Sequence, residues 1–245
     1  MGKIIAVVSG KGGTGKTSFT ANVGLALAAL GCHTLCLDCD ITLRNLDLAL
    51  GLSDRALMDF TDVIAGRCTL EDAVVQHPKY PKLHLLTAPL SARPVPIAPE
   101  QMKALLDRIR QTYDYCLIDA PAGLGMGFHL SSDYADRAVV VTNTDASSLR
   151  DAQRVVAELD WLPQVHLVMN RIQPKLLRKL RTTIDDAMNT AGLPLIGVIP
   201  EDAQVMLCAN RGIPLTSQGR KGAAMACRNI AWRLMGRRVP IMRIR

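Results

Sequence analysis

The residues that most directly suggest a chemistry form one glycine-rich segment near the N-terminus, with the pattern GxxxxGK[ST]. The glycines of this pattern let several backbone N–H groups turn toward one centre, where they can cradle phosphate. Its lysine, Lys16, can reach the β- and γ-phosphates of ATP, and the hydroxyl of Thr17 can bind Mg²⁺. The phosphate-binding residues predicted by this segment are Gly10, Lys11, Gly12, Gly13, Thr14, Gly15, Lys16, Thr17 and Ser18.

A phosphate-binding loop also needs an acid from a second strand to hold the shell of the magnesium ion. The apolar run Tyr115–Ile118 ends at Asp119 and is followed by Ala-Pro-Ala and then Gly123. Asp119 is expected to lie near the magnesium, through a water, and the N–H of Gly123 to meet the γ-phosphate and sense its loss. An acid at a strand end can also cap a turn, and that structural interpretation stays open beside the functional one.

Strands and helices must alternate to position these residues, and the sequence predicts that they do. Short apolar runs predict strands buried on both faces of a parallel sheet. The predicted strands are 3–8, 33–38, 83–87, 115–119, 138–142, 165–169 and 195–199, and the predicted helices are 16–30, 99–112, 147–160, 174–191, 202–211 and 221–236. The alternation predicts an α/β fold, a doubly wound and mostly parallel sheet with helices on both faces. We expect one domain over 1–245 with a short basic tail at 237–245.

The composition narrows the class of protein. Hydrophobic residues make up 49% of the chain and charged residues 21%, which excludes a disordered chain. No apolar run approaches the ~18 residues that a membrane span needs, so a cytoplasmic location is expected. The stretch 40–64 mixes polar and apolar residues irregularly, as segments that carry ligand contacts often do, and Pro89–Pro99 is interpreted as a loop leading into a helix.

The net charge of +7 is unevenly distributed, because residues 220–245 hold eight bases and no acid. This basic segment could serve an anionic surface or only solubility. The seven cysteines are expected to be reduced, and Cys36 and Cys39 to be small buried hydrophobes rather than a metal or redox site. The five histidines share no spacing and are interpreted as surface or satisfied residues.

Lys11 adds a second lysine to the loop, which then reads KGGTGKT and resembles the deviant Walker A loop of the MinD/ParA superfamily of ATPases. Four further strings resemble the MinD family within it, in the same order along nearly the whole chain. They are 37–47 (LDCDITLRNLD), 119–123 (DAPAG), 142–143 (TN) followed by 147–151 (SSLRD), and 197–202 (GVIPED).

The resemblance implies roles that spacing alone does not supply. It implies a slow, partner-stimulated ATPase that dimerises with ATP, in which Lys11 reaches the phosphates bound by the partner subunit. It makes Asp40 the residue that positions the attacking water, so the catalytic set becomes Asp40, Lys11 and Lys16. Asn45 would belong to the same switch. Asn170 would contact the adenine, and Pro200, Glu201 and Asp202 would line its other side. The magnesium set becomes Thr17, Asp119 and Asp38, although Asp38 and Asp40 could be ordinary strand-end acids.

The resemblance also implies positioning of the division septum, with Min-type regulators such as MinC- or MinE-like proteins as partners. Members of the MinD family usually end in a short amphipathic helix that lies on the membrane. By this resemblance the sequence stops before that segment. Either the sequence is truncated there, or the protein lacks the usual anchor, or its own basic tail makes a weak contact with the anionic inner face of the cell membrane. A frayed terminus is the structural alternative.

Three other functions stay open from the sequence. A ParA-like partition ATPase would use the basic tail to bind nucleic acid without sequence preference. A flagellar-placement relative of the MinD family would share the motifs above. The chain shows no separate DNA-binding domain and its RNLDL string resembles the MinD family, which makes nucleic-acid binding the weaker alternative. A metal-cluster carrier of the same fold would need a pair of interfacial thiols, and the absence of a C-terminal CxxC makes that function weaker still.

Overall fold

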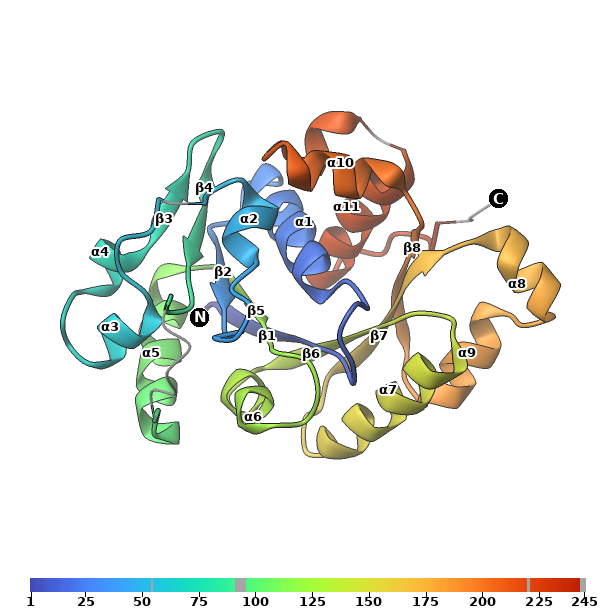
Figure 1. Ribbon diagram of the computed structural model, residues 1–245, viewed down its shortest axis with the longest axis horizontal. Helices are drawn as coiled ribbons and strands as arrows, with labels where there is room; N and C mark the ends of the chain where they lie inside the picture. The colour runs from blue at the N-terminus through green and yellow to red at the C-terminus, as the bar shows by residue number, and fades with distance from the viewer. Residues whose placement is uncertain (54, 91–95, 220, 243–245) are drawn as a thin grey trace.

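The computed structural model describes residues 1–53, 55–90, 96–219 and 221–242. Within them one eight-stranded sheet runs through the molecule in the order β3-β4-β2-β5-β1-β6-β7-β8 (Figure 1). Its strands are β1 (Lys3–Val8), β2 (Thr34–Asp38), β3 (Val75–His77), β4 (Tyr80–Leu86), β5 (Tyr115–Asp119), β6 (Arg137–Thr142), β7 (Val165–Ile172) and β8 (Leu195–Pro200). All neighbours pair in parallel except β3, which is antiparallel to β4 at the edge.

Helices cover both faces of this sheet, which confirms the predicted α/β fold (Figure 1). The helices are α1 (Lys16–Ala29), α2 (Leu46–Leu50), α3 (Phe60–Ile64), α4 (Leu70–Ala73), α5 (Pro99–Thr112), α6 (Met126–Ser132), α7 (Ala146–Glu158), α8 (Pro174–Leu180), α9 (Ile184–Ala191), α10 (Ala203–Asn210), the short 3₁₀ helix η1 (Leu215–Gln218) and α11 (Gly222–Leu234). Helices α1, α2, α10 and α11 pack on one face, and α3 to α7 with α9 on the other.

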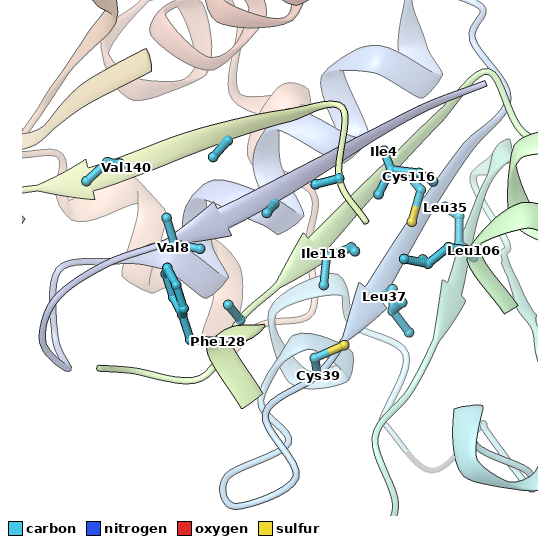
Figure 2. Packing of buried hydrophobic residues seen from close by; sticks show 14 of the residues in the cluster. Ile4, Val8, Leu35, Leu37, Cys39, Leu106, Cys116, Ile118, Phe128 and Val140 are labelled. Atoms are coloured by element: carbon cyan, nitrogen blue, oxygen red, sulfur yellow. The ribbon is translucent and has the colours of Figure 1, made fainter. Parts of the chain in front are cut away.

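Alternate residues of each strand face opposite layers, so each central strand supplies two cores. Ile4 and Val8 of β1 pack toward α5 and α6, whereas Ile5 and Val7 pack toward α1 and α11. Figure 2 shows the first of these cores, where Leu106 of α5 and Phe128 of α6 meet the inner strands. Burial on both faces explains why these strands appear in the sequence as continuous apolar runs.

The single helix predicted over 174–191 is wrong, because the structure has two helices there. Helix α8 ends at Leu180, and Arg181 then takes a left-handed conformation with φ of 51°. Thr183 starts α9 by accepting a hydrogen bond from the backbone N–H of Asp186, and the Asp186 side chain returns the bond in a capping box. The sequence Thr183-Ile-Asp-Asp186 does carry this signal, since Thr183 and Asp186 stand at the spacing of a capping box.

The short elements β3, α2, α3, α4 and α6 were also absent from the prediction. The four helices have four to seven residues, too few to show a helical period in the sequence. Part of the irregular stretch 40–64 is therefore helical, at α2 and α3. Within the Pro89–Pro99 segment, residues 91–95 lie outside the described residues, and Pro99 begins α5 as its first residue.

The basic tail is tied back to the body where the structure describes it. The guanidinium of Arg233 donates to the carbonyls of Val239, Pro240 and Ile196, and Arg237 stacks over the ring of Trp232 at 4.0 Å. Residues 243–245, and with them two of the predicted tail bases, lie outside the described residues, as does Arg220. Among the helices that the structure describes, none is both long enough and apolar enough to cross a membrane.

Candidate nucleotide-binding site

The glycine-rich loop connects β1 to α1 at the carboxyl end of the sheet, which is the position expected for a ligand site in this topology. Gly15 takes a φ of 93°, and a Cβ at this position would collide with the side-chain amide of Asn170. A Cβ at Gly12 or Gly13 would meet no atom within 4 Å, so these glycines face open space. The Thr14 hydroxyl is buried and has no hydrogen-bond partner among the described residues. The loop therefore leaves room and unused polar capacity where phosphate would lie.

Lys16 is held under this loop rather than extended into water. Its side chain is 8% exposed, and its ammonium donates to the Ser9 hydroxyl at 2.9 Å. Burial lowers the pKa of Lys16, while the nearby carboxylates of Asp119 and Asp40 act against that shift. The amine is thus pre-positioned by the fold, and its charge is balanced from the neighbouring strand ends.

Thr17 and Asp119 meet directly, as the sequence predicted that they would lie near each other. The Thr17 hydroxyl donates to one Asp119 carboxylate oxygen at 2.6 Å, and the Thr20 hydroxyl donates to the other at 3.2 Å. Burial raises the pKa of Asp119 to about 6, against the lowering effect of these hydroxyls and of Lys16. Because burial disfavours the ionised form of Asp119, a further positive charge beside this carboxylate would stabilise it.

The chemistry of this pair fits magnesium held largely by a nucleotide. Mg²⁺ prefers oxygen ligands and usually binds one or two protein groups together with substrate phosphates and waters. Thr17 and Asp119 present such oxygens, and the part of the chain that the structure describes has no group of three or more His, Cys, Asp or Glu residues able to hold a metal by themselves. The geometry therefore suits an ion that arrives with ATP.

Asp38 is fully buried at the end of β2, where it organises the segment that follows. One carboxylate oxygen accepts from the backbone N–H of Asp40 at 2.9 Å, and the other accepts from that of Leu46 at 3.1 Å. Burial, helped by the neighbouring charge of Asp119, raises its pKa to about 7. Both oxygens are thus already engaged by the chain, and the magnesium role of Asp38 stays a prediction.

Asp40 lies at the surface end of the same turn, within electrostatic reach of Lys16. Its carboxylate accepts from the backbone N–H groups of Thr42 and Leu43, both at 3.1 Å. Asn45 is exposed just before α2, and its side chain does not cap that helix. Asp40 thus lies within electrostatic reach of the phosphate loop, whereas no side-chain hydrogen bond of Asn45 is found among the described residues and its role stays a prediction.

Gly123 follows β5 in a left-handed conformation, with φ of 87°. Its N–H donates to the carbonyl of Ser9 at 3.2 Å, so this donor is already used by the strand that leads into the phosphate loop. A γ-phosphate could recruit the N–H only by displacing that bond, which would couple the loop after β5 to the nucleotide.

Lys11 bends back onto its own chain. Its ammonium donates to an Asp145 carboxylate oxygen at 2.9 Å and to the Ser147 hydroxyl at 2.8 Å. Partial burial alone would raise the pKa of Asp145, but hydrogen bonds from Ser147, Ser148 and Lys11 hold it well below its usual range. The side chains of Lys11 and Asp145 remain 36% and 49% exposed, so water can replace the ion pair readily.

A cavity of about 310 Å³ continues from the loop along the α1 surface. The residues that line it on the loop and α1 side are Gly15, Ser18, Phe19, Asn22, Asn170 and Arg171, and on the far side Pro200, Glu201, Asp202, Met206 and Leu215. The four residues predicted for the adenine side therefore line one cavity. Asn170 is 7% exposed and donates to the carbonyl of Thr14 at 2.8 Å, so it also braces the phosphate loop.

Asp202 and Glu201 have structural partners at the rim of this cavity. Asp202 caps α10 by accepting from the N–H of Gln204 and also accepts from the N–H of Ala223, which joins α10 to α11. Glu201 pairs with Arg171 at 3.3 Å. The mixed lining, apolar on the helices and polar at the rim, suits a planar base of moderate polarity.

Sequence reasoning missed three residues of the site. Ser9 precedes the motif and holds Lys16, Thr20 follows it by one helical turn and holds Asp119, and Asp145 holds Lys11 from another strand end. Thr20 could have been found, because it lies three residues after Thr17 on the same face of a predicted helix. Ser9 and Asp145 carry no spacing signal that would have singled them out.

The chain is similar to known proteins in both sequence and structure. A sequence profile described as the CobQ/CobB/MinD/ParA nucleotide binding domain matches residues 5–215. The septum site-determining protein MinD of Bacillus subtilis is 38% identical over 98% of this chain and 92% of its own length. The structure resembles that of the MinC:MinD cell division protein complex of Aquifex aeolicus, with TM-score 0.91, 36% identity and 98% of each chain covered. It also resembles the septum site-determining protein MinD of Pyrococcus horikoshii in complex with Mg-ADP, with TM-score 0.84, 31% identity and 96% of each chain covered.

Proposed function

The chain belongs to the CobQ/CobB/MinD/ParA family of nucleotide-binding domains and stands among its MinD members. On that premise we propose that it is an Mg²⁺-dependent ATPase that dimerises with ATP and thereby helps to place the division septum. The observation that carries the proposal is the joint placement of Lys16, Thr17 and Asp119 beneath a loop that leaves open space at Gly12 and Gly13. That arrangement suits phosphate together with its metal.

The roles of the residues follow from their positions. The loop N–H groups and Lys16 bind the β- and γ-phosphates, and the base enters the cavity between α1 and the turn Pro200–Asp202. Asp40 accepts hydrogen bonds and lies near Lys16, so it orients the attacking water. Positioning contributes most of the catalysis in phosphoryl transfer, so Asp40 does not need to be a strong base.

Thr17 and Asp119 would hold the magnesium, Thr17 directly and Asp119 through a water, and Asp38 would support the segment that carries Asp40. When bound, the ion neutralises the charge that develops on the β- and γ-phosphate oxygens. The protein groups fix its place: Thr20 keeps the Asp119 carboxylate aimed toward Thr17.

Lys11 provides the link between nucleotide and dimer. In the single chain it rests on Asp145 and Ser147, an exposed ion pair worth about 1 kcal/mol or less. A phosphate bound by a second copy offers the ammonium a stronger, less hydrated partner, so Lys11 would leave Asp145 and cross the interface. ATP then joins the two copies, and hydrolysis releases them.

The nucleotide state would control where in the cell the protein binds. A face completed only in the ATP dimer would bind a division regulator of the MinC or MinE type, as the Aquifex relative forms a MinC:MinD complex. We place the protein in the cytoplasm, with a peripheral and nucleotide-dependent association at the inner face of the cell membrane. Doubling a weak surface contact in a dimer raises its avidity without any new contact.

Deletion of the gene in its own organism tests this function. The expected result is septa near the cell poles and chromosome-free small cells, restored to normal by the wild-type gene and not by a Lys16→Ala gene. Septa that stay at mid-cell while flagella are misplaced, or chromosomes are lost, would reject septum placement and assign the same ATPase to a different cargo.

A further inference from the structure

Helix α8 and its flanks carry a concentrated positive charge outside the nucleotide site. Residues 171–184 include five bases and no acid. All five bases are exposed, and only Arg171 has an ion-pair partner among the described residues, Glu201. The remaining four, Lys175, Arg178, Lys179 and Arg181, are free to meet an external anion.

The same helix presents leucines to solvent. Leu176 is 41% exposed and Leu180 is 52% exposed, and their spacing of four places them on one side of the helix. Leu177 is partly buried and packs against the core between the sheet and α3 to α7 with α9. Lys175 and Lys179 also stand four apart, so a lysine stripe runs beside the leucine stripe. Figure 1 shows α8 at the margin of the molecule, on the outer side of β7.

We propose that this surface, Lys175, Leu176, Lys179 and Leu180, is a docking site for an anionic phospholipid bilayer. The two lysines suit anionic headgroups, and the two leucines can enter the boundary between headgroups and acyl chains. Nucleic acid would satisfy the bases equally well but would leave the leucines in water, since phosphate backbones offer them no apolar contact. The leucines therefore decide between the two anions.

The site goes beyond the proposed function, because it needs neither the phosphate loop nor the basic tail. A surface with only two inserted leucines binds weakly, so its contribution adds to that of other membrane contacts. Since electrostatic attraction decays over a Debye length of about 10 Å at 0.1 M salt, binding should weaken sharply as salt rises.

The test is sedimentation of the full chain with sucrose-loaded vesicles of phosphatidylcholine, with and without phosphatidylglycerol, in Mg-ADP and in Mg-ATP. We expect the wild type to pellet only with phosphatidylglycerol. The variant K175E/K179E should lower the partition coefficient about tenfold or more, since each base near an anionic surface is worth about a factor of five. The variant L176S/L180S should lower it by a similar factor without changing the net charge.

The matched control is K103E/R108E, which makes the same charge change on the exposed side of α5. It should keep the partition coefficient within about twofold of wild type, because the changed residues lie on a different element. All variants should keep their melting temperature and their affinity for Mg-ATP, which shows that they fold.

Two results would overturn the proposal. Equal losses in K103E/R108E and K175E/K179E would mean that only net charge matters. Wild-type partitioning of L176S/L180S would mean that the leucines stay in water; if K175E/K179E then also lost retention of duplex DNA, the surface would be a nucleic-acid site instead.

Discussion

The floor of the nucleotide site and the segments above it are built in opposite ways. On the floor, Lys16, Thr20 and Asp119 are buried, and their polar atoms are joined by hydrogen bonds between strands β1 and β5 and helix α1. Above it, Asp40 and Lys11 lie at the surface, held by bonds within one turn or by one exposed ion pair.

This difference separates the residues proposed to bind nucleotide from those proposed to change partners when it binds. A buried and hydrogen-bonded floor holds its polar groups close to the place proposed for phosphate, so few bonds have to rearrange when phosphate and its metal arrive. The upper segments are held by contacts that water can replace, so they can change partners when ATP or a second copy is present. The fold thus holds firmly the residues proposed to bind nucleotide, and holds less firmly those proposed to respond to it.

The largest expected effect comes from the floor. Lys16→Ala should weaken ATP binding about 100-fold or more, because it removes charge-assisted hydrogen bonds to two phosphates. Titration with a fluorescent ATP analogue measures the change, and Lys3→Ala, at an exposed lysine that begins β1, is the control. Equal affinities for the two variants would show that the floor is not the phosphate site.

The next effect comes from the upper segment and should leave binding intact. Asp40→Ala should keep the affinity for ATP but lower turnover about 100-fold, since a misplaced nucleophile costs a factor of that order. Phosphate release measures turnover, with Asp160→Ala on the exposed α7–β7 connection as the control. Normal turnover would remove Asp40 from the mechanism.

Lys11→Ala tests the second loose part. It should retain ATP binding and abolish ATP-dependent dimerisation, because the cross-subunit contact is lost while the floor remains. Light-scattering mass in Mg-ATP checks the result. A stable dimer of this variant would leave Lys11 as an ordinary surface lysine paired with Asp145.

The smallest expected effect is a dependence of the free energy of unfolding on pH in the absence of nucleotide. Burial raises the pKa of Asp38 to about 7 and that of Asp119 to about 6, whereas an unfolded Asp titrates near 4. Between about pH 4 and pH 7 the folded protein therefore binds more protons, and the free energy of unfolding falls as pH rises. Melting temperature from pH 5 to pH 8 should decline less steeply in Asp38→Asn than in wild type or Asp160→Asn. A slope in Asp38→Asn equal to that of the wild type would contradict the raised pKa of Asp38.

The sequence predicted the motif residues of both regions, but not all of the side chains that hold them in place. The loop Gly10–Thr17 and Asp119 were predicted together because a fixed spacing and a strand end carry their chemistry. Ser9 and Asp145 were missed because their roles arise only from tertiary contacts, one with Lys16 and one with Lys11. The fold class could be predicted because the buried strands appear in the sequence as continuous apolar runs.

The limits of prediction have the same physical cause elsewhere in the fold. The division of 174–191 into α8 and α9 depends on the left-handed Arg181 and the cap at Thr183, which outweigh a continuous helical pattern. The short helices α2 and α3 are fixed by packing and capping rather than by periodicity. Local patterns therefore predicted long buried elements, and contacts decided the short ones.

The most direct test of the switch is the mass of Asp40→Ala in solution, measured by light scattering with Mg-ATP and with Mg-ADP. This variant should retain the triphosphate, so the ATP state persists during the measurement. We expect a dimer with Mg-ATP and a monomer with Mg-ADP. The same mass in both nucleotides, with ATP binding confirmed in the same sample, would contradict a nucleotide-gated dimer.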